Sequence, residues 1–266
     1  MGNVQMVTRF APSPTGYLHI GHVVNAIYVW RMAGETGGRV LLRMEDHDRI
    51  RCRPEYEAAI LEDLDWLGFV PDDGLRPLLR QSDRTHLYEE ALSRLRATHH
   101  VYACDCSRKQ IAGERYDGHC RGRRLADEPG RGLRVRIDPG PERFEDLLLG
   151  AVEQTPADQC GDLLVRDRDG QWTYQFAATV DDLLQGVTHV IRGEDLLSST
   201  ARQIRLARML GRIDTPVYLH HPLVLKSNGE KLSKSAADTG VRELRRAGMT
   251  SADVIDLASI RAGLGK

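Results

Sequence analysis

The feature that most constrains the fold of this chain is a short polar turn between two apolar segments at its N-terminus. Residues 4–10 predict a buried strand, and residues 23–33 predict a helix that ends at Gly34. Between them lies the stretch 12–22, PSPTGYLHIGH, which contains two glycines and two histidines. A strand, a glycine-containing turn and a helix N-terminus together form an anion-binding geometry. The N-terminal region is therefore predicted to begin an α/β fold with a site for a phosphate-bearing ligand.

A second cationic motif lies near the other end of the chain. Lys231 and Lys234 belong to the sequence KLSKS, which follows a stretch containing Asn and Gly. Reacting phosphates need positive charge and hydrogen-bond donors that strengthen as charge develops. Either motif alone is more often a surface turn or a solvated basic face. Both motifs in this order favour an ATP site, with His19, Gly21 and His22 at the phosphates and the two lysines on the departing pyrophosphate.

The order of predicted elements favours a Rossmann-type parallel α/β sheet. Strands alternate with helices as far as residue 102, and the alternation breaks in a stretch rich in Gly, Pro and Arg. We expect the first half of a catalytic domain at 1–102, an inserted subdomain at 103–170, the second half at 171–240 and a C-terminal helical segment at 241–266. The remaining predicted strands are 39–44, 133–137, 163–165 and 187–191, and the remaining predicted helices are 54–67, 83–95, 198–210 and 241–262.

Composition limits the class of protein. The net charge of the chain is −1, so the whole molecule exerts no strong attraction on nucleic acid. Arginines nevertheless cluster at 121–143 and 242–246, where they form either a phosphate-facing patch or an ordinary solvated face. No apolar run approaches the roughly 20 residues that span a bilayer, and the N-terminus lacks the pattern of a secretory signal. We therefore expect a cytoplasmic protein with no membrane partner.

Three of the five cysteines fall within one short segment, which favours a metal site over a disulfide framework. Cys104, Cys106 and Cys120 can supply three thiolates of a tetrahedral site, and soft ligands favour zinc. On chemistry alone the usual fourth ligand would be His119. Three unligated cysteines are the alternative.

The two signatures together resemble those of class I aminoacyl-tRNA synthetases, and residues 9–16, RFAPSPTG, narrow the resemblance to the glutamyl branch. The spacing Cys-x-Cys followed by Tyr-x-x-x-Cys resembles the zinc module of the glutamyl-queuosine tRNA(Asp) synthetases. That resemblance implies one structural Zn²⁺ bound by Cys104, Cys106, Tyr116 and Cys120, with His119 as the rival for Tyr116.

The resemblance also implies a pocket for glutamate. Two arginines suit bidentate capture of carboxylates, a glutamate can hold the ammonium group, and hydroxyl groups supply further hydrogen bonds. The implied pocket residues are Arg9, Ala11, Ser13, Glu45, Tyr174 and Arg192.

The expected reaction follows from the same resemblance. Only about thirty residues follow Lys234, whereas ordinary bacterial glutamyl-tRNA synthetases continue into an anticodon-binding domain. The glutamyl-queuosine family activates L-glutamate with ATP and Mg²⁺ in the absence of tRNA, and then transfers it to queuosine at the wobble position of tRNA(Asp). We expect the same activity here, in a monomer. The alternatives are a conventional or truncated glutamyl-tRNA synthetase that charges a 3′ end, and an inactive regulator that binds glutamate or ATP.

Overall fold

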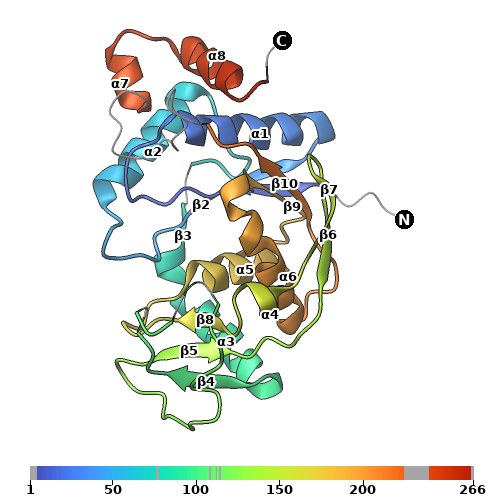
Figure 1. Ribbon diagram of the computed structural model, residues 1–266. Coiled ribbons are helices and arrows are strands. Elements are labelled where there is room, and N and C mark those ends of the chain that lie inside the picture. Colours follow the sequence, from blue (N-terminus) through green and yellow to red (C-terminus); the bar gives the residue numbers. More distant parts are fainter. Residues whose placement is uncertain are drawn as a thin grey trace. The chain divides into compact units, whose positions relative to one another are not determined.

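The computed structural model describes residues 5–75, 78–107, 109–111, 113, 115–224 and 240–264 (Figure 1). The chain divides into two compact units. The first unit contains Met1–Asp83, Val187–Asp195 and Tyr218–Lys266, and the second contains Arg84–Gly186 and Leu196–Val217. The expected division at residues 102, 170 and 240 stays a prediction.

The first unit is built on a parallel sheet, as the alternation of strands and helices predicts. Strand β1 (Val7–Phe10) pairs in parallel with β2 (Arg39–Met44), which pairs in parallel with β3 (Leu79–Arg80). Thr188 extends the unit beside β1, because its backbone N–H donates to Val7 O at 2.9 Å. It directly precedes β9 (His189–Gly193), whose neighbour is β10 (Val217–His221).

Helix α1 (Ile20–Thr36) connects β1 to β2 and is longer than predicted at both ends. The prediction that it ends at Gly34 is wrong. Gly34 continues the helix, and Gly37 is the residue that ends it, with φ 64° and its N–H bonded to Ala33 O. A left-handed conformation is what stops a helix, and glycine adopts it without steric cost.

Two C-terminal helices, α7 (Val241–Arg246) and α8 (Ser251–Arg261), replace the single helix expected over 241–262. Gly248, with φ 90°, separates them. Thr250 and Asp253 then form a capping box that starts α8. Helix α8 packs on α1 and on α2 (Pro54–Leu67).

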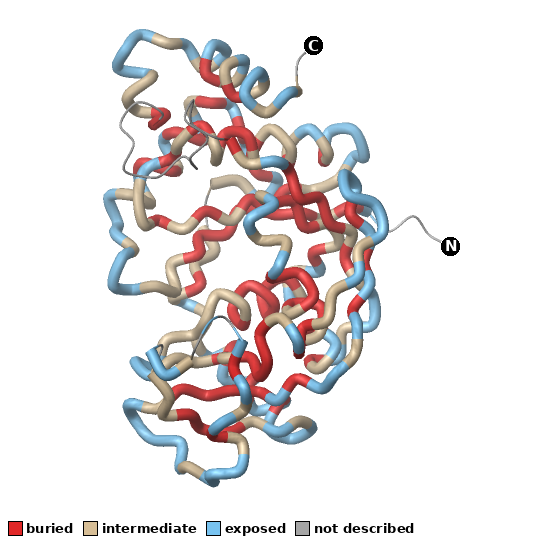
Figure 2. The backbone as a smooth tube through the Cα atoms, in the orientation of Figure 1, coloured by how far each residue is buried: buried red, intermediate tan, exposed pale blue. Residues whose placement is uncertain are grey.

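The hydrophobic core of the first unit joins residues from both ends of the chain. Its strands and the inner faces of its helices are the buried segments of this unit in Figure 2. Core members from the N-terminal elements include Phe10, Val24 and Leu42, and those from the C-terminal helices include Val254 and Ala258. The sheet is therefore positioned by packing between distant parts of the sequence.

The second unit contains an antiparallel sheet of β4 (Val101–Cys104), β5 (Gly132–Val135) and β8 (Leu163–Arg166). It confirms that strands lie in the two segments predicted as 133–137 and 163–165. No helix in the described part of the chain is long and apolar enough to cross a membrane. The other elements of this unit are η1 (Gln81–Arg84) at its boundary, α3 (Thr85–Thr98), the hairpin β6 (Glu142–Asp146) and β7 (Gly150–Gln154), α4 (Pro156–Gln159), α5 (Tyr174–Leu184), η2 (Glu194–Ser199), also at its boundary, and α6 (Thr200–Met209).

Candidate functional site

The two histidines of the first signature lie together at the N-terminus of α1. His19 is the N-cap, and its Nδ1 accepts the backbone N–H of Gly21 at 3.1 Å. The Nδ1 atom of His22 accepts the backbone N–H of His19, also at 3.1 Å. The ring centroids are 3.9 Å apart. Because Nδ1 of each ring accepts a hydrogen bond, the proton of each neutral ring lies on Nε2. Each histidine can thus donate through Nε2 to an anion at a helix terminus that already favours negative charge.

Gly21 is required by this arrangement of rings. A Cβ atom added there would lie 2.9 Å from Cε1 of His19, which is closer than side chains pack. The sequence motif predicted that Gly21 lies at the phosphates of ATP. In the structure, the space beside Gly21 holds the imidazole of His19.

The second signature falls outside the described residues, and with it Lys231 and Lys234. The described chain resumes at Gly240, which forms an antiparallel bridge with His19. The backbone N–H of Val241 donates to Leu18 O at 2.9 Å. The segment after the second signature is therefore bonded to the first signature.

Three charged residues predicted to bind glutamate lie near the carboxyl ends of strands β1, β2 and β9. Arg9 is on β1, Glu45 directly follows β2 and Arg192 is on β9. All three are buried, with 4%, 7% and 4% of their surface exposed. A guanidinium N–H of Arg9 donates to Ile191 O at 3.5 Å, which places Arg9 beside the residue that precedes Arg192. Strand ends of this kind are where open α/β sheets bind ligands.

The loop that contains Ala11 and Ser13 lies against the same strand ends. The backbone N–H of Glu45 donates to Pro12 O at 3.0 Å, so this loop follows the end of β2. Ser13 Oγ is 3.9 Å from Cys52 Sγ. Five of the six residues predicted to bind glutamate thus belong to the first unit.

Tyr174 is the sixth predicted residue and lies in the second unit, as the first residue of α5. Thr173 caps this helix by accepting the N–H of Phe176. That Tyr174 shares a pocket with the other five residues stays a prediction.

Two buried side chains that contact predicted site residues were missed from the sequence. Arg43 is fully buried and donates to Glu45 Oε1 at 3.0 Å. His220 on β10 accepts a hydrogen bond from Arg192. A signal for each was available, because an arginine in the apolar run 40–44 and two histidines at the end of the strand 217–221 are unusual for buried strands.

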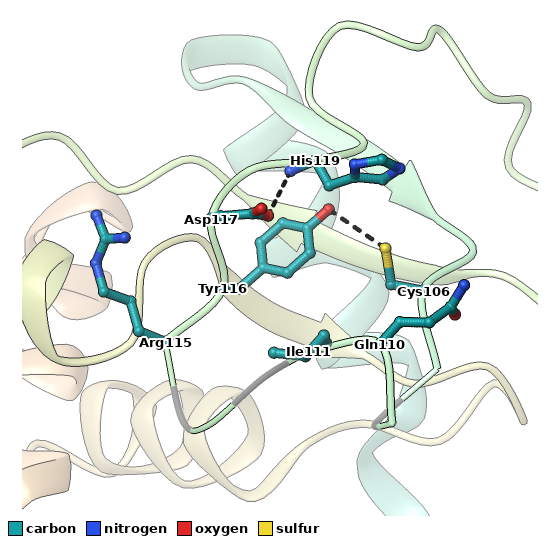
Figure 3. Close-up of a pocket in the computed structure, with 7 residues that line it drawn as sticks. All are labelled: Cys106, Gln110, Ile111, Arg115, Tyr116, Asp117 and His119. Atoms are coloured by element: carbon teal, nitrogen blue, oxygen red, sulfur yellow. Dashed lines mark hydrogen bonds between the residues drawn. The ribbon is translucent and has the colours of Figure 1, made fainter.

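The cysteines of the predicted metal site do come together in the second unit. The Sγ atoms of Cys104, Cys106 and Cys120 all lie within 4.8 Å of one another. The hydroxyl of Tyr116 is 3.5 Å from Cys104 Sγ and 4.0 Å from Cys106 Sγ. Figure 3 shows the Tyr116 hydroxyl directed at the sulfur of Cys106. Three thiols that converge in this way can supply three of the four ligands of a tetrahedral zinc site, and the Tyr116 hydroxyl lies beside them.

His119 does not join this cluster. It is exposed, and its ring is not among the groups whose ligand atoms converge on the three sulfurs. In Figure 3 its imidazole turns away from the Tyr116 hydroxyl. The geometry therefore favours Tyr116 over His119 as the fourth donor.

The surroundings shift the pKa values of Cys104 and Cys106 in opposite directions. Burial alone would raise the pKa of Cys104, but its hydrogen bonds with Tyr116 and Arg134 lower that pKa overall. Burial and the contact with Cys120 raise the pKa of Cys106 to about 12. A divalent cation would remove this conflict, because it binds and stabilises the deprotonated thiolates.

A glycine holds the tyrosine of the cluster in place. Tyr116 forms a parallel bridge with Gly161, and its backbone N–H donates to Cys160 O at 2.9 Å. A Cβ atom at residue 161 would lie 1.8 Å from Tyr116 O, so only glycine fits. Gly161 also has φ 65°, which disfavours other residues.

A family model described as tRNA synthetases class I (E and Q), catalytic domain, matches residues 5–257. The match thus covers both units and includes every site residue considered above.

Three curated relatives share one name. The chain is 45% identical over 242 residues to a protein of Cupriavidus metallidurans named Glutamyl-Q tRNA(Asp) synthetase, covering 86% of this chain and 76% of the relative. Proteins with the same name from Geobacter sulfurreducens and Thiobacillus denitrificans are 45% and 42% identical. The alignments cover 86% and 92% of this chain, and 75% and 83% of those relatives.

Solved structures show the same fold. A glutamate tRNA ligase from Elizabethkingia meningosepticum, in complex with its amino acid, superposes with a TM-score of 0.76 at 29% identity. A glutamate-tRNA synthetase from Elizabethkingia anophelis gives a TM-score of 0.75 at 29% identity. Each comparison covers 92% of this chain but only 53% and 54% of the other, so this chain spans about half the length of these two structures.

Proposed function

Since the chain belongs to the family of class I glutamyl- and glutaminyl-tRNA synthetase catalytic domains, we propose that it is an ATP-dependent ligase that transfers L-glutamate to queuosine in tRNA(Asp). The observation that supports this substrate most strongly is the 42–45% identity to three proteins named Glutamyl-Q tRNA(Asp) synthetase. The buried Arg9, Glu45 and Arg192 at the strand ends supply the charges that an amino acid with two carboxylates needs.

The first step is formation of glutamyl-adenylate. An oxygen of the glutamate α-carboxylate attacks the α-phosphate of ATP, and pyrophosphate leaves with the electrons of the broken P–O bond. His19 and His22 hold phosphate oxygens through Nε2 at the α1 terminus. Lys231 and Lys234 stabilise the pyrophosphate, and Mg²⁺ accompanies ATP. The step needs no covalent nucleophile from the protein.

The second signature is close in sequence to a residue that pairs with the first. Lys234 precedes Gly240 by six positions, and Gly240 is bridged to His19. This pairing supports the proposal that both signatures serve one ATP site.

Glutamate is held by groups of opposite charge. Arg9 and Arg192 bind its carboxylates, Glu45 binds its ammonium group, and Ser13 and Tyr174 donate or accept through hydroxyls, while Ala11 is a small neighbour. A pocket with a buried arginine rejects glutamine, because the neutral amide would leave the arginine charge unpaired.

In the second step, a hydroxyl of the cyclopentene-diol of queuosine attacks the activated carbonyl. The new ester bond forms as the bond between the carbonyl carbon and the phosphate oxygen breaks. AMP leaves with the electrons of that bond, and the proton of the hydroxyl is released to the AMP phosphate or to water. The anticodon loop is single-stranded, so the modified base can be unstacked and inserted into a pocket. A structural Zn²⁺ at Cys104, Cys106, Tyr116 and Cys120 would hold the inserted region of the second unit together without taking part in either step. We expect the enzyme to act as a monomer in the cytoplasm.

The test uses radiolabelled glutamate, ATP and three tRNA samples: tRNA(Asp) with queuosine, tRNA(Asp) without it, and unmodified tRNA(Glu). Label only on the queuosine-containing sample, lost when periodate first cleaves the diol, is the expected result. Label on unmodified tRNA(Glu) would instead support the 3′-end charging suggested by the two solved glutamate-tRNA ligases. An absence of label on every tRNA would overturn both and favour a glutamate- or ATP-binding regulator.

A further inference from the structure

Arg192 makes a defined contact with a histidine on the neighbouring strand. Its Nε–H donates to Nε2 of His220 at 3.2 Å. His220 is only 2% exposed and Arg192 only 4%, so water competes little with this hydrogen bond. A guanidinium can donate but cannot accept, so Nε2 of His220 must be unprotonated. The ring is therefore the neutral tautomer with its proton on Nδ1.

A tyrosine supports both members of this pair. The ring of Tyr218 is stacked on that of His220, with centroids 5.8 Å apart and planes 8° from parallel. The guanidinium carbon of Arg192 lies 5.7 Å from the centroid of the Tyr218 ring. The parallel stack restricts rotation of the His220 ring, and the hydrogen bond transmits that restriction to the plane of the guanidinium.

We propose that His220 is a positioning residue that orients Arg192 for capture of a substrate carboxylate. A guanidinium can present two edges to a carboxylate, one formed by Nε and Nη and the other by the two Nη groups. Because His220 accepts the hydrogen bond from Nε, it fixes the plane in which Arg192 presents its N–H groups. The inference rests on the proposed function, since it takes Arg192 to be a partner of glutamate.

The adjacent histidine provides a matched control. His221 is also buried, at 4% exposed, but its ring stacks on Tyr28 with centroids 5.0 Å apart. Its ring nitrogens contact Pro222 O and Asn25 Oδ1. Adjacent residues of a strand point to opposite faces, so His221 has no part in orienting Arg192.

The experiment compares three variants with the wild-type protein: His220→Leu, His220→Gln and His221→Leu. Leucine fills much of the volume but cannot accept a hydrogen bond, whereas the Oε1 atom of glutamine can replace Nε2. Glutamate-dependent exchange of pyrophosphate into ATP gives kcat and the KM of each substrate, and calorimetry gives the Kd for glutamate without turnover. Thermal unfolding identifies any variant that does not fold.

We expect His220→Leu to raise the KM and Kd for glutamate at least tenfold, with kcat and the KM for ATP changed less than about twofold. His220→Gln should recover glutamate binding to within about threefold of wild type. His221→Leu should lower the Tm without a selective effect on glutamate. A tenfold increase in the Kd for glutamate corresponds to a loss of about 1.4 kcal/mol of binding free energy.

Three results would overturn the proposal. They are wild-type glutamate binding in a folded His220→Leu protein, a His220→Gln protein as impaired as His220→Leu, and equal increases in the KM for glutamate and ATP. If the wild-type protein binds glutamate but does not exchange pyrophosphate into ATP, the proposed activity is contradicted. The calorimetric Kd values of the variants would still test the role of His220. A wild-type protein that does not bind glutamate would overturn both.

Discussion

His19 and His22 cap the same helix terminus reciprocally, each ring accepting a backbone N–H through its Nδ1 atom. The same two side chains are proposed to bind phosphate through Nε2, so the capping bonds also fix the direction in which each ring donates. In each ring, Nδ1 therefore stabilises the helix terminus, and Nε2 is the atom proposed to bind phosphate.

Substitutions of His19 should separate these two roles. His19→Asn keeps a good N-cap but loses the imidazole, so we expect unfolding free energy within about 0.5 kcal/mol of wild type and pyrophosphate exchange reduced on the order of a hundredfold. His19→Ala should lose the same activity and also about 1 kcal/mol of stability. Chemical denaturation and the exchange assay measure the two effects. Equal exchange by His19→Asn and wild type would refute the phosphate role.

Removal of Arg43 should destabilise the first unit strongly. The Arg43 side chain is fully buried and that of Glu45 nearly so, and they are joined by one hydrogen bond of 3.0 Å. Arg43→Met leaves a buried carboxylate without its cation, at a cost of about 3–5 kcal/mol in unfolding free energy. The double variant Arg43→Met/Glu45→Gln should recover part of that loss. If the double variant is no more stable than Arg43→Met, the loss comes from packing rather than from charge.

Cys104→Ser should reduce bound zinc. The variant removes one of three sulfurs that converge within 4.8 Å, so we expect less than one tenth of the wild-type zinc content after dialysis, and a lower Tm, because binding of metal to the native state stabilises it. Elemental analysis measures the metal. Cys160→Ser is the control, since Cys160 is also buried but is not in the cluster. Similar zinc in Cys104→Ser and wild type would eliminate the metal site.

Asp63→Asn should stabilise the protein near neutral pH. Asp63 on α2 is fully buried, neither carboxylate oxygen has a hydrogen-bond partner, and burial raises its pKa to about 6. Because the pKa is raised in the folded state, the protein has its full stability while Asp63 is neutral, below the unfolded pKa of about 3.9. Stability is lost as Asp63 ionises and the pH rises through about 6. We expect Asp63→Asn to add about 1–2 kcal/mol at pH 7.5 and almost nothing at pH 4.

Urea denaturation at a series of pH values measures this effect, and Glu62→Gln serves as the control. Glu62 is the neighbour of Asp63 in sequence, and its charge raises the pKa of Asp63 only as a lesser cause beside burial. Its side chain is 55% exposed, so its removal should reduce the dependence near pH 6 much less than Asp63→Asn does. A difference between Asp63→Asn and wild type that is the same at pH 4 and pH 7.5 would contradict the assignment.

The sequence was most predictive for sites whose residues lie close together along the chain. The turn from residue 12 to 22 carries its strand, glycine and histidines within a few positions, and three cysteines within seventeen residues converge as expected. In each case, the chain needs only a short loop to bring the groups together.

Contacts between distant strands were not predictable in the same way. The alternation of apolar residues places Arg192 at a strand end, but it does not tell which side chain of β10 lies beside it. The end of α1 also depended on conformation rather than composition. Gly34 and Gly37 are alike in sequence, and only the backbone at Gly37 turns left-handed, where the chain must reverse into β2.

The pairing of His19 with Gly240, and the packing of α8 on α1, affect the order in which this protein can fold during its synthesis. Residues of β1, α1 and β2 precede the second unit in the sequence, yet their core includes Val254 and Ala258, so this core cannot close until those two residues have been synthesised. All residues of the second unit, Arg84–Gly186 and Leu196–Val217, emerge earlier. Vectorial synthesis therefore favours folding of the second unit first, while the apolar faces of β1 and α1 stay uncovered and prone to aggregation until α8 has been made.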